Sequence, residues 1–144
     1  MELSRIAKRP AVSTHSRATV EEVCQCLKNE GVGAVAVIDE GRLVGIISER
    51  DIVVRVVAPG LDPRTTFASE IMTAQVRTVS EDITTRQALG LMHEGRFRHL
   101  PLLDRAGKVI GMLSVRDLLR DRIDELDSEN TGLMSFIQAD GPGG

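Results

Sequence analysis

The sequence repeats itself once along its length, and this duplication constrains the fold more than any other feature. The segment GIISERDI begins at Gly45 and GMLSVRDL begins at Gly111, an offset of 66 residues. Gly, Ser, Arg and Asp occupy the same four places in both segments, and aliphatic residues match aliphatic residues between them. The 144 residues suffice for one ordinary domain or for two half-size units that share a core. The repeat favours the second arrangement and leaves no room for a separate catalytic domain beside it.

The similarity continues upstream of these segments with one residue inserted. AVAVIDEGRLVG from Ala34 matches HLPLLDRAGKVIG from His99 at an offset of 65 residues, and the extra residue falls in a turn. Earlier still, residues 19–30 align with residues 84–95, and both stretches have apolar residues at helical spacing. Each copy is therefore predicted to hold a short extended lead-in, a helix, two strands joined by a tight turn, and a second helix. The predicted strands are the aliphatic runs 34–38, 43–47, 100–103 and 109–113, and the second helices begin after Ser48 and Ser114.

The predicted fold class is mixed α/β (α+β), with three segments along the chain. Residues 1–64 form repeat 1 with its N-terminal lead-in, and residues 65–125 form repeat 2. The stretch APGLDPRTTF between the copies is rich in Pro, Gly and Asp, which is typical of a connector. Residues 126–144 form a tail that is partly helical, with a helix expected over 126–138 before the flexible end ADGPGG.

Composition narrows the classes of partner. Aromatic residues make up 2% of the chain, with no Trp and no Tyr, so few rings are available to stack on exposed bases. The net charge of −3 lacks the basic excess that binding to a phosphate backbone needs. No apolar run approaches the roughly 20 residues that cross a bilayer, and the start MELSRIAKRP has no signal-peptide character. We therefore expect no nucleic-acid partner, no membrane partner and a cytoplasmic location.

The paired repeats also resemble a known family. GIISERDI in the first copy, with RFRHLPLLD and GMLSVRDL in the second, is similar to the pattern of tandem CBS domains, the Bateman module. The resemblance covers roughly residues 6–125, and within the family it is strongest to bacterial stand-alone CBS-pair proteins. It implies that the two repeats pack sheet to sheet about a pseudo-twofold axis and leave two related clefts. It also implies a regulatory role without catalysis, in which AMP, ADP, ATP or NAD(H) binds between the repeats.

A Ser followed three residues later by Asp opens the second helix of each copy, as Ser48 with Asp51 and as Ser114 with Asp117. In the CBS family this Asp typically holds ribose hydroxyls. The N–H groups and positive dipole end of a helix start suit a phosphate or a hydroxyl, and an Asp in the first turn can accept hydrogen bonds from a vicinal diol. Ser-x-x-Asp is also an ordinary helix-capping arrangement. Its recurrence at matched positions favours ligand binding over capping alone.

The resemblance implies that each cleft combines residues of both repeats. One cleft has Arg98 and His99 at the positions where the other has Gly33 and Ala34. We therefore expect the first of these clefts to be basic and to hold the more highly charged phosphate group, and the other to be nearly neutral. Pro101 is expected to hold the backbone extended near the cleft mouth. One cleft should combine Ser48 and Asp51 with Arg98, His99 and Leu100, and the other Ser114 and Asp117 with Val32, Gly33, Ala34 and Val35; further candidates are Ser13 and Thr78 near the purine, with Arg50 and Arg116 as helpers.

Two other functions stay open at this point. A structural or adaptor homodimer would have vestigial clefts and no nucleotide-dependent stabilisation. A small redox protein would use Cys24 and Cys26, but residues at i and i+2 of a helix point about 200° apart. The matching positions in repeat 2 are Leu89 and Leu91, so the cysteines are interpreted as packing residues. No Cys or His cluster has metal-ligand spacing.

The expected assembly is a homodimer, because the second helices of CBS pairs usually pack against a second module. Any regulatory output must then pass through another protein chain, an effector of unknown identity, or through a change in assembly. The apolar residues expected at the homodimer interface are Ile52, Val53, Val56, Val57, Leu118 and Leu119.

Overall fold

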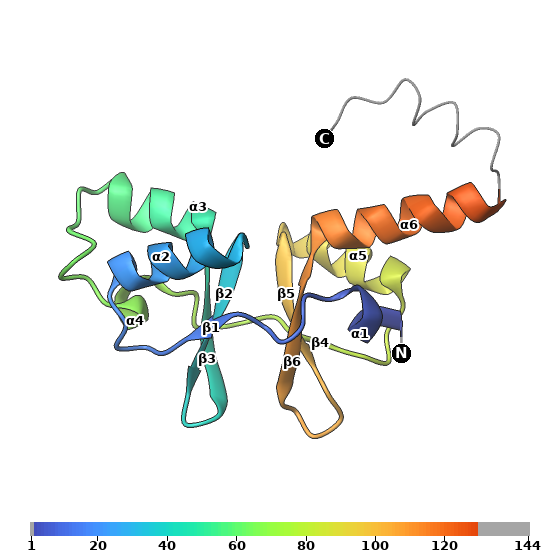
Figure 1. The fold of residues 1–144 in the computed structure, drawn as a ribbon, viewed down its shortest axis with the longest axis horizontal. Helices are drawn as coiled ribbons and strands as arrows, with labels where there is room; N and C mark the ends of the chain where they lie inside the picture. Colours follow the sequence, from blue (N-terminus) through green and yellow to red (C-terminus); the bar gives the residue numbers. More distant parts are fainter. Residues whose placement is uncertain (1, 130–144) are drawn as a thin grey trace.

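Two units with the same order of elements lie side by side in the computed structural model, which describes residues 2–129 (Figure 1). The expected lead-in, helix, hairpin and second helix are present in both units, and the α+β class is confirmed. The first unit holds β1 (Ser13–Thr14), α2 (Val20–Glu30), β2 (Ala34–Asp39), β3 (Arg42–Ser48) and α3 (Glu49–Ile52), which continues as the π-helix η1 (Val53–Val57). The second unit holds β4 (Val79–Ser80), α5 (Thr85–Gly95), β5 (His99–Leu103), β6 (Val109–Ser114) and α6 (Val115–Glu129).

Each unit contains one three-stranded sheet with the same topology. The short first strand pairs in parallel with the second, which pairs antiparallel with the third, giving the orders β1-β2-β3 and β4-β5-β6. Ala34 at the start of β2 lies opposite Ser48 at the end of β3, and His99 lies opposite Ser114 in the second sheet. This register places the start of the middle strand beside the start of the second helix in each unit.

Local capping explains where the first helix of each unit begins and ends. Thr19 and Thr84 accept hydrogen bonds from backbone N–H groups three residues further on, which satisfies a free donor at the start of α2 and of α5. Both helices end on a residue with a left-handed backbone. In α2 this residue is Gly31, the usual choice, whereas in α5 it is Arg96.

The apolar residues form two cores, one in each unit, in place of the expected shared core. Helix α4 (Ala68–Ile71) packs in the first core although it follows the connector, and helix α1 (Glu2–Ile6) packs in the second although it begins the chain. Each unit thus takes its short helix from the segment assigned by sequence to the other repeat. Both helices bury one large apolar residue, Ile71 or Leu3, against the sheet they cover.

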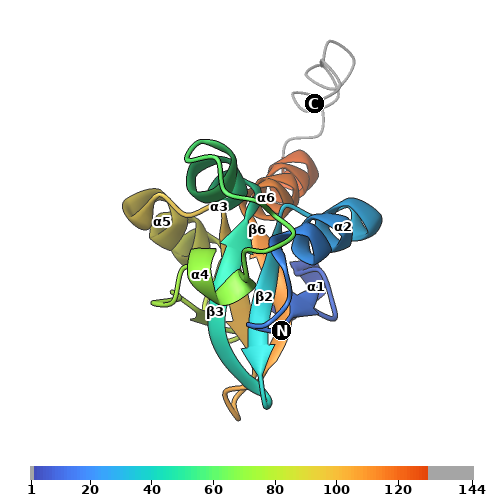
Figure 2. The same cartoon turned by 90° about the vertical axis from the view of Figure 1, so that its left-hand side faces the viewer.

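The second helices, α3 with η1 and α6, lie on the same side of the molecule (Figures 1 and 2). Val56 and Leu118 are almost fully buried in the two cores, so they are unavailable for the expected homodimer interface. Ile52 is half-buried against the first core. Helical periodicity turns these side chains inward and their neighbours outward. The exposed members of the expected interface are Val53, Val57 and Leu119.

Helix α6 continues without a break to Glu129, so residues 126–129 extend this helix rather than begin a separate one. The rest of the helix expected over 126–138, and the tail to residue 144, lie outside the described residues. Among the described helices, none is both long enough and apolar enough to cross a membrane.

Candidate functional site

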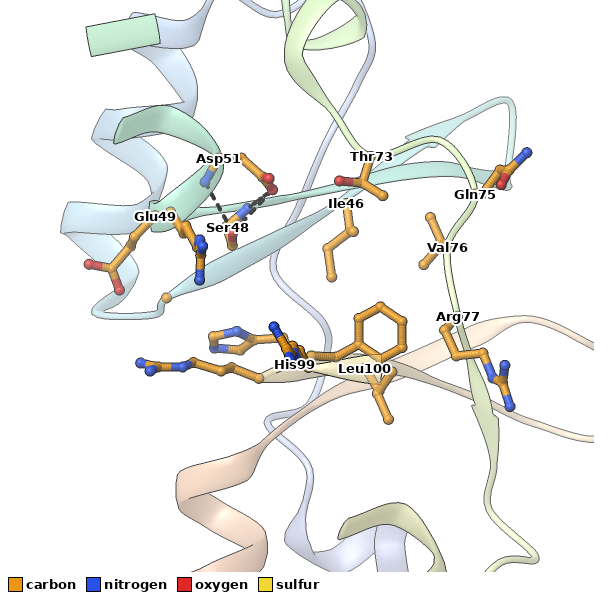
Figure 3. A pocket seen from close by; sticks show the side chains of 15 residues that line it. Ile46, Ser48, Glu49, Asp51, Thr73, Gln75, Val76, Arg77, His99 and Leu100 are labelled. Atoms are coloured by element: carbon orange, nitrogen blue, oxygen red, sulfur yellow. Dashed lines mark hydrogen bonds between the residues drawn. The ribbon is translucent and has the colours of Figure 1, made fainter. Parts of the chain in front are cut away.

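Two cavities of similar size lie between the units. The first, at the start of α3 and of β5, has a volume of about 590 Å³, and the second, at the start of α6 and of β2, about 610 Å³ (Figure 3 shows the first). The first cavity is lined by Gly33, Ile46, Ser48, Glu49, Arg50, Asp51, Thr73, Gln75, Val76, Arg77, Arg96, Phe97, Arg98, His99 and Leu100. The second is lined by Lys8, Val12, Leu27, Lys28, Glu30, Gly31, Val32, Gly33, Ala34, Glu49, His99, Met112, Ser114, Arg116, Asp117 and Arg120.

Each cavity combines a helix start from one unit with a strand start from the other. The helix start lies beside its own unit's middle strand, and the matching strand of the other unit faces it across the interface. The structure thus groups these residues across the repeats, whereas their binding of a ligand stays a prediction. The first cavity brings together Ser48, Arg50 and Asp51 with Arg98, His99 and Leu100, and the second Ser114, Arg116 and Asp117 with Val32, Gly33 and Ala34.

Four candidate residues lie outside the linings of both cavities. Val35 and Pro101 are buried within strands β2 and β5. Because side chains alternate across a strand, Val35 points into its own core while Ala34, one residue before it, faces the second cavity. Ser13 lies exposed on β1, and Thr78 precedes β4. The lead-in segments do reach the cavities, but through other residues.

The carboxylate of Asp51 is already engaged by its own helix start (Figure 3). The Ser48 backbone N–H donates to Asp51 Oδ2 at 2.8 Å, and Ser48 Oγ donates to the same oxygen at 3.0 Å. The Asp51 N–H donates to Ser48 Oγ at 3.2 Å, which completes a capping box. Arg55 Nε lies 3.9 Å from the other carboxylate oxygen, Oδ1. A ligand hydroxyl at Asp51 must therefore share the carboxylate with these groups.

The matching carboxylate of Asp117 has no such contacts. The Asp117 N–H donates to Ser114 Oγ at 3.0 Å, but across residues 2–129 the carboxylate itself has no hydrogen-bond or ion-pair partner. The side chain is half-buried at the second cavity. The two Asp residues therefore differ although their sequence patterns match: Asp51 caps its helix, and the Asp117 carboxylate can accept hydrogen bonds from a ligand.

Both cavities carry basic side chains, which corrects the expected contrast between a basic cleft and a nearly neutral one. Among the described residues, four basic side chains line each cavity, beside two carboxylates in the first and three in the second. Three of the cations of the second cavity come from the lead-in, the last turn of α2 and the second turn of α6, outside the two strand starts on which the expected contrast was based. The basic residues are Arg50, Arg77, Arg96 and Arg98 in the first cavity and Lys8, Lys28, Arg116 and Arg120 in the second.

Gly33, Glu49 and His99 line both cavities and form a wall that the cavities share. A Cβ atom on Gly33 would lie 2.8 Å from Glu49 Oε1 and 3.0 Å from His99 Nε2, so any side chain at position 33 would displace them. Burial lowers the pKa of His99, although the nearby carboxylates of Glu49 and Asp117 act to raise it. The imidazole is therefore mainly neutral at pH 7 and can both donate and accept a hydrogen bond at this wall.

The first cavity is also lined by four residues that are absent from the sequence-based site: Thr73, Gln75, Val76 and Arg77. Thr73 exchanges two backbone hydrogen bonds with Ile46, of 3.0 and 2.9 Å, which hold the segment against β3. Lys8 makes the matching pair with Met112, both of 3.0 Å, at the second cavity. Lys8 and Thr73 are 65 residues apart, the offset of the repeat. Extending the repeat alignment upstream would therefore have found both.

Cys24 and Cys26 are half-buried on α2, pack against the first core and line neither cavity. Burial, with smaller effects from Glu21 and Glu30 respectively, raises the pKa of each thiol and disfavours the reactive thiolate. These observations favour the packing role. Within the part of the chain that the structure describes, no group of three or more His, Cys, Asp or Glu could hold a metal ion.

A family model for the CBS domain matches residues 3–58 and again residues 68–124. The chain belongs to the CBS-domain family. Each match begins in the short helix, α1 or α4, that packs on the other unit. The two units are therefore a pair of CBS repeats, as the resemblance of the sequence implied.

The CBS pair is similar to an uncharacterized protein of Methanopyrus kandleri, with 34% identity over 82% of this chain, and it spans only 61% of the length of that relative. Among solved structures, a CBS-domain containing protein from Agrobacterium tumefaciens shares 32% identity and a TM-score of 0.74. That match covers 79% of this chain and 90% of the other.

Two structural neighbours are complexed with adenine compounds. A CBS domain protein from Pyrobaculum aerophilum, complexed with AMP, has 32% identity and a TM-score of 0.72, over 79% of this chain and 87% of the other. The CBS domain pair of protein MJ0100, in complex with 5′-methylthioadenosine and S-adenosyl-L-methionine, has 27% identity and a TM-score of 0.73, over 81% and 91%.

Proposed function

We propose that this CBS pair binds an adenine nucleotide in the cavities between its units and acts as a regulatory module without catalysis. The observation that carries the proposal is a Ser-x-x-Asp helix start of one unit facing a strand start of the other, repeated at both cavities. Neighbours at 32% and 27% identity are complexed with AMP, 5′-methylthioadenosine and S-adenosyl-L-methionine, which share an adenosine group. That shared group supports an adenosine-containing ligand here.

The lining of the first cavity offers a suitable surface to each part of such a ligand. Ile46 and Val76 face the same space and form an apolar surface for the base (Figure 3). Asp51 can accept hydrogen bonds from ribose hydroxyls, and Arg98 can donate to a phosphate. Both cavities fall within the range of about 300–1,000 Å³ typical of small-molecule sites.

The ligands that we favour are AMP and its relatives ADP and ATP, with NAD(H) next. The cavity between Asp117 and the Val32–Ala34 strand start is the better candidate for ribose binding, because this carboxylate has no partner among the described residues. Arg116 and Arg120 of α6 line the same cavity, and their guanidinium groups can donate hydrogen bonds to phosphate.

Regulation by this module requires either another chain or a change in its own assembly. Exposed apolar residues on the second helices favour a homodimer: Val57 is 67% exposed, Val53 58% and Leu119 49%. These residues lie on helices that share one side of the molecule (Figure 1). The protein effector and a cytoplasmic location stay predictions.

The direct test is a thermal-shift screen of the whole chain with AMP, ADP, ATP, NAD, NADH and S-adenosylmethionine. A ligand that binds only the folded protein at 100 times its Kd stabilises it by about 2.7 kcal/mol. We expect a concentration-dependent rise in Tm with at least one adenine nucleotide and none with inorganic phosphate alone. The double variant Asp51→Ala, Asp117→Ala is the control and should lose the rise.

The alternative is a structural or adaptor homodimer with vestigial clefts. The capping box that engages the Asp51 carboxylate favours a vestigial first cavity, because this carboxylate already has partners within the protein. It predicts no rise in Tm with any compound of the screen. It also predicts that calorimetry detects no adenine-containing ligand with a Kd below about 1 mM. That result would contradict the regulatory function proposed above.

A further inference from the structure

Arg96 and Gly31 hold the same place in the two repeats with nearly the same backbone conformation. Each ends the first helix of its unit, with φ 57° and ψ 34° at Arg96 and φ 64° and ψ 36° at Gly31. A left-handed backbone is unfavourable for a residue with a Cβ atom, which is why Gly is the usual residue at this position. Repeat 2 therefore carries a long cationic side chain where its backbone favours Gly.

Nothing in the fold of the described residues accounts for the arginine. Its backbone N–H donates to the carbonyls of His93 and Met92, a bond that any residue but Pro can make. Its guanidinium, which is exposed, has no hydrogen-bond or ion-pair partner within residues 2–129.

The position of Arg96 relative to the cavities suggests what its side chain is for. Arg96 lines the first cavity, and Gly31 lines the second at the matching point. Arg98, two residues further on, also lines the first cavity, whereas its counterpart Gly33 brings no charge. Strained residues cluster at ligand sites, because a contact made there offsets the strain.

We propose that Arg96 is a specificity residue of the first cavity that donates hydrogen bonds to the phosphate groups of the bound nucleotide. Planar guanidinium groups match phosphate oxygens in two-point hydrogen bonds, so its effect grows with the number of phosphates on the ligand. The second cavity has Gly31 at this point and gains no such contact. This inference rests on the function proposed above.

The test follows binding at each cavity separately by NMR of methyl-labelled protein. The methyl groups of Val76 report on the first cavity and that of Met112 on the second, because each lines only one of the two. The probes are adenosine, AMP and ATP. In Arg96→Gly we expect the Kd for ATP in the first cavity, as reported by Val76, to rise about tenfold. This rise corresponds to a loss of about 1.4 kcal/mol of binding free energy. The Kd for adenosine in the first cavity should stay unchanged. Binding of all three probes in the second cavity, as reported by Met112, should also stay unchanged.

A reciprocal variant and a control sharpen the test. A Cβ atom on Gly31 would meet no heavy atom within 4 Å, so Gly31→Arg has space and should tighten ATP binding at Met112. Because its backbone stays left-handed, Gly31→Arg should lower the Tm, whereas Arg96→Gly should not. If Gly31→Arg fails to fold, Arg96→Asn removes the charge with a residue that accepts this backbone. Arg86→Ala, on the same helix outside both cavities, should change no Kd.

The outcomes separate the inference from the function on which it rests. If no adenine compound shifts either reporter in the unaltered protein, the proposed function is wrong. If the compounds bind and Arg96→Gly leaves the Kd for ATP unchanged, only the role of Arg96 is wrong. An equal loss of adenosine and ATP binding would also overturn it, because that result would assign Arg96 to the shape of the cavity rather than to phosphate.

Discussion

His99 Nε2 lies 3.0 Å from the point where a Cβ atom of Gly33 would stand, so a side chain of one unit rests against the bare backbone of the other. The two residues, with Glu49, form the wall between the cavities. The absence of a side chain at Gly33 allows the units to approach this closely.

Replacing Gly33 with Ala should therefore disturb both cavities at once. The added methyl group must displace the ends of Glu49 and His99, and overpacking of this kind costs about 1–3 kcal/mol. We expect lower stability in urea unfolding and weaker nucleotide binding at both cavities. Gly90→Ala is the control: it lies in α5 with nothing within 4 Å of its added Cβ, and should raise stability by about 0.5–1 kcal/mol. Equal effects of the two changes would contradict the packing described here.

The stability of the protein should decrease when the pH falls below about 6.5 because of His99. Burial lowers the pKa of His99 in the folded protein, assisted by Arg98 and opposed by Glu49 and Asp117. The unfolded chain then binds more protons between the folded pKa and about 6.5. The stability that His99 contributes is thus complete above its pKa in the unfolded chain. It is lost as the pH falls through its lower pKa in the folded protein.

Urea unfolding between pH 5 and pH 8 measures this effect as the difference between the protein and His99→Gln. The difference should shrink or reverse as the pH falls. A hydrogen bond from Ser16 lowers the pKa of Asp39, whose titration therefore lies below 3.8 and outside this window. His93→Gln, at an exposed histidine, is the control: the same change in this variant would show that the effect does not belong to His99.

Asp51→Ala and Asp117→Ala should differ in their effect on stability. Asp51 accepts two hydrogen bonds from Ser48 in a capping box, and loss of a helix cap costs about 0.5–2 kcal/mol. The Asp117 carboxylate has no partner among the described residues, so its removal should change the free energy of unfolding little. Denaturant unfolding without ligand compares the two variants directly. A larger loss in Asp117→Ala would show that its carboxylate stabilises the fold.

The same substitutions should separate the two binding events. Asp51→Ala and Arg98→Ala should weaken the same event, because both residues line the first cavity, and Asp117→Ala should weaken the other. Loss of a hydrogen bond to a charged group costs about 1.5–3 kcal/mol. Calorimetric titration of each variant with AMP measures these losses. If Arg98→Ala and Asp117→Ala removed one site together while Asp51→Ala spared it, the assignment of residues to the two events would be wrong.

Val57→Glu should weaken the proposed homodimer without unfolding the chain. Val57 is 67% exposed on η1, and a charge there opposes burial against a second copy. Light scattering at tens of micromolar should show a dimer for the unaltered protein and a smaller species for the variant. Leu61→Glu, an exposed apolar residue in the connector, is the control and should leave the assembly intact. A monomeric unaltered protein at this concentration would refute the dimer.

Much of the fold was predictable because its causes act over a few residues of the chain. Thr19 and Thr84 cap the helices that begin directly after them, Ser48 and Ser114 end strands and start helices, and aliphatic runs form the hairpins. Repetition of these local signals at an offset of 65 or 66 residues then predicted two similar units. The grouping of each helix start with the opposite strand start came from the family resemblance, not from local signals.

Only the tertiary structure decided which distant segments meet. Lys8 and Arg120 line one cavity although 112 positions apart along the chain, and helices α1 and α4 pack on the units opposite to their sequence assignment. Likewise Ser48 and Ser114 share a pattern, yet only Asp51 turns back onto its own helix start. The sequence by itself determined the units, because capping and periodicity are local; it left the linings undetermined, because they depend on how two complete surfaces pack against each other.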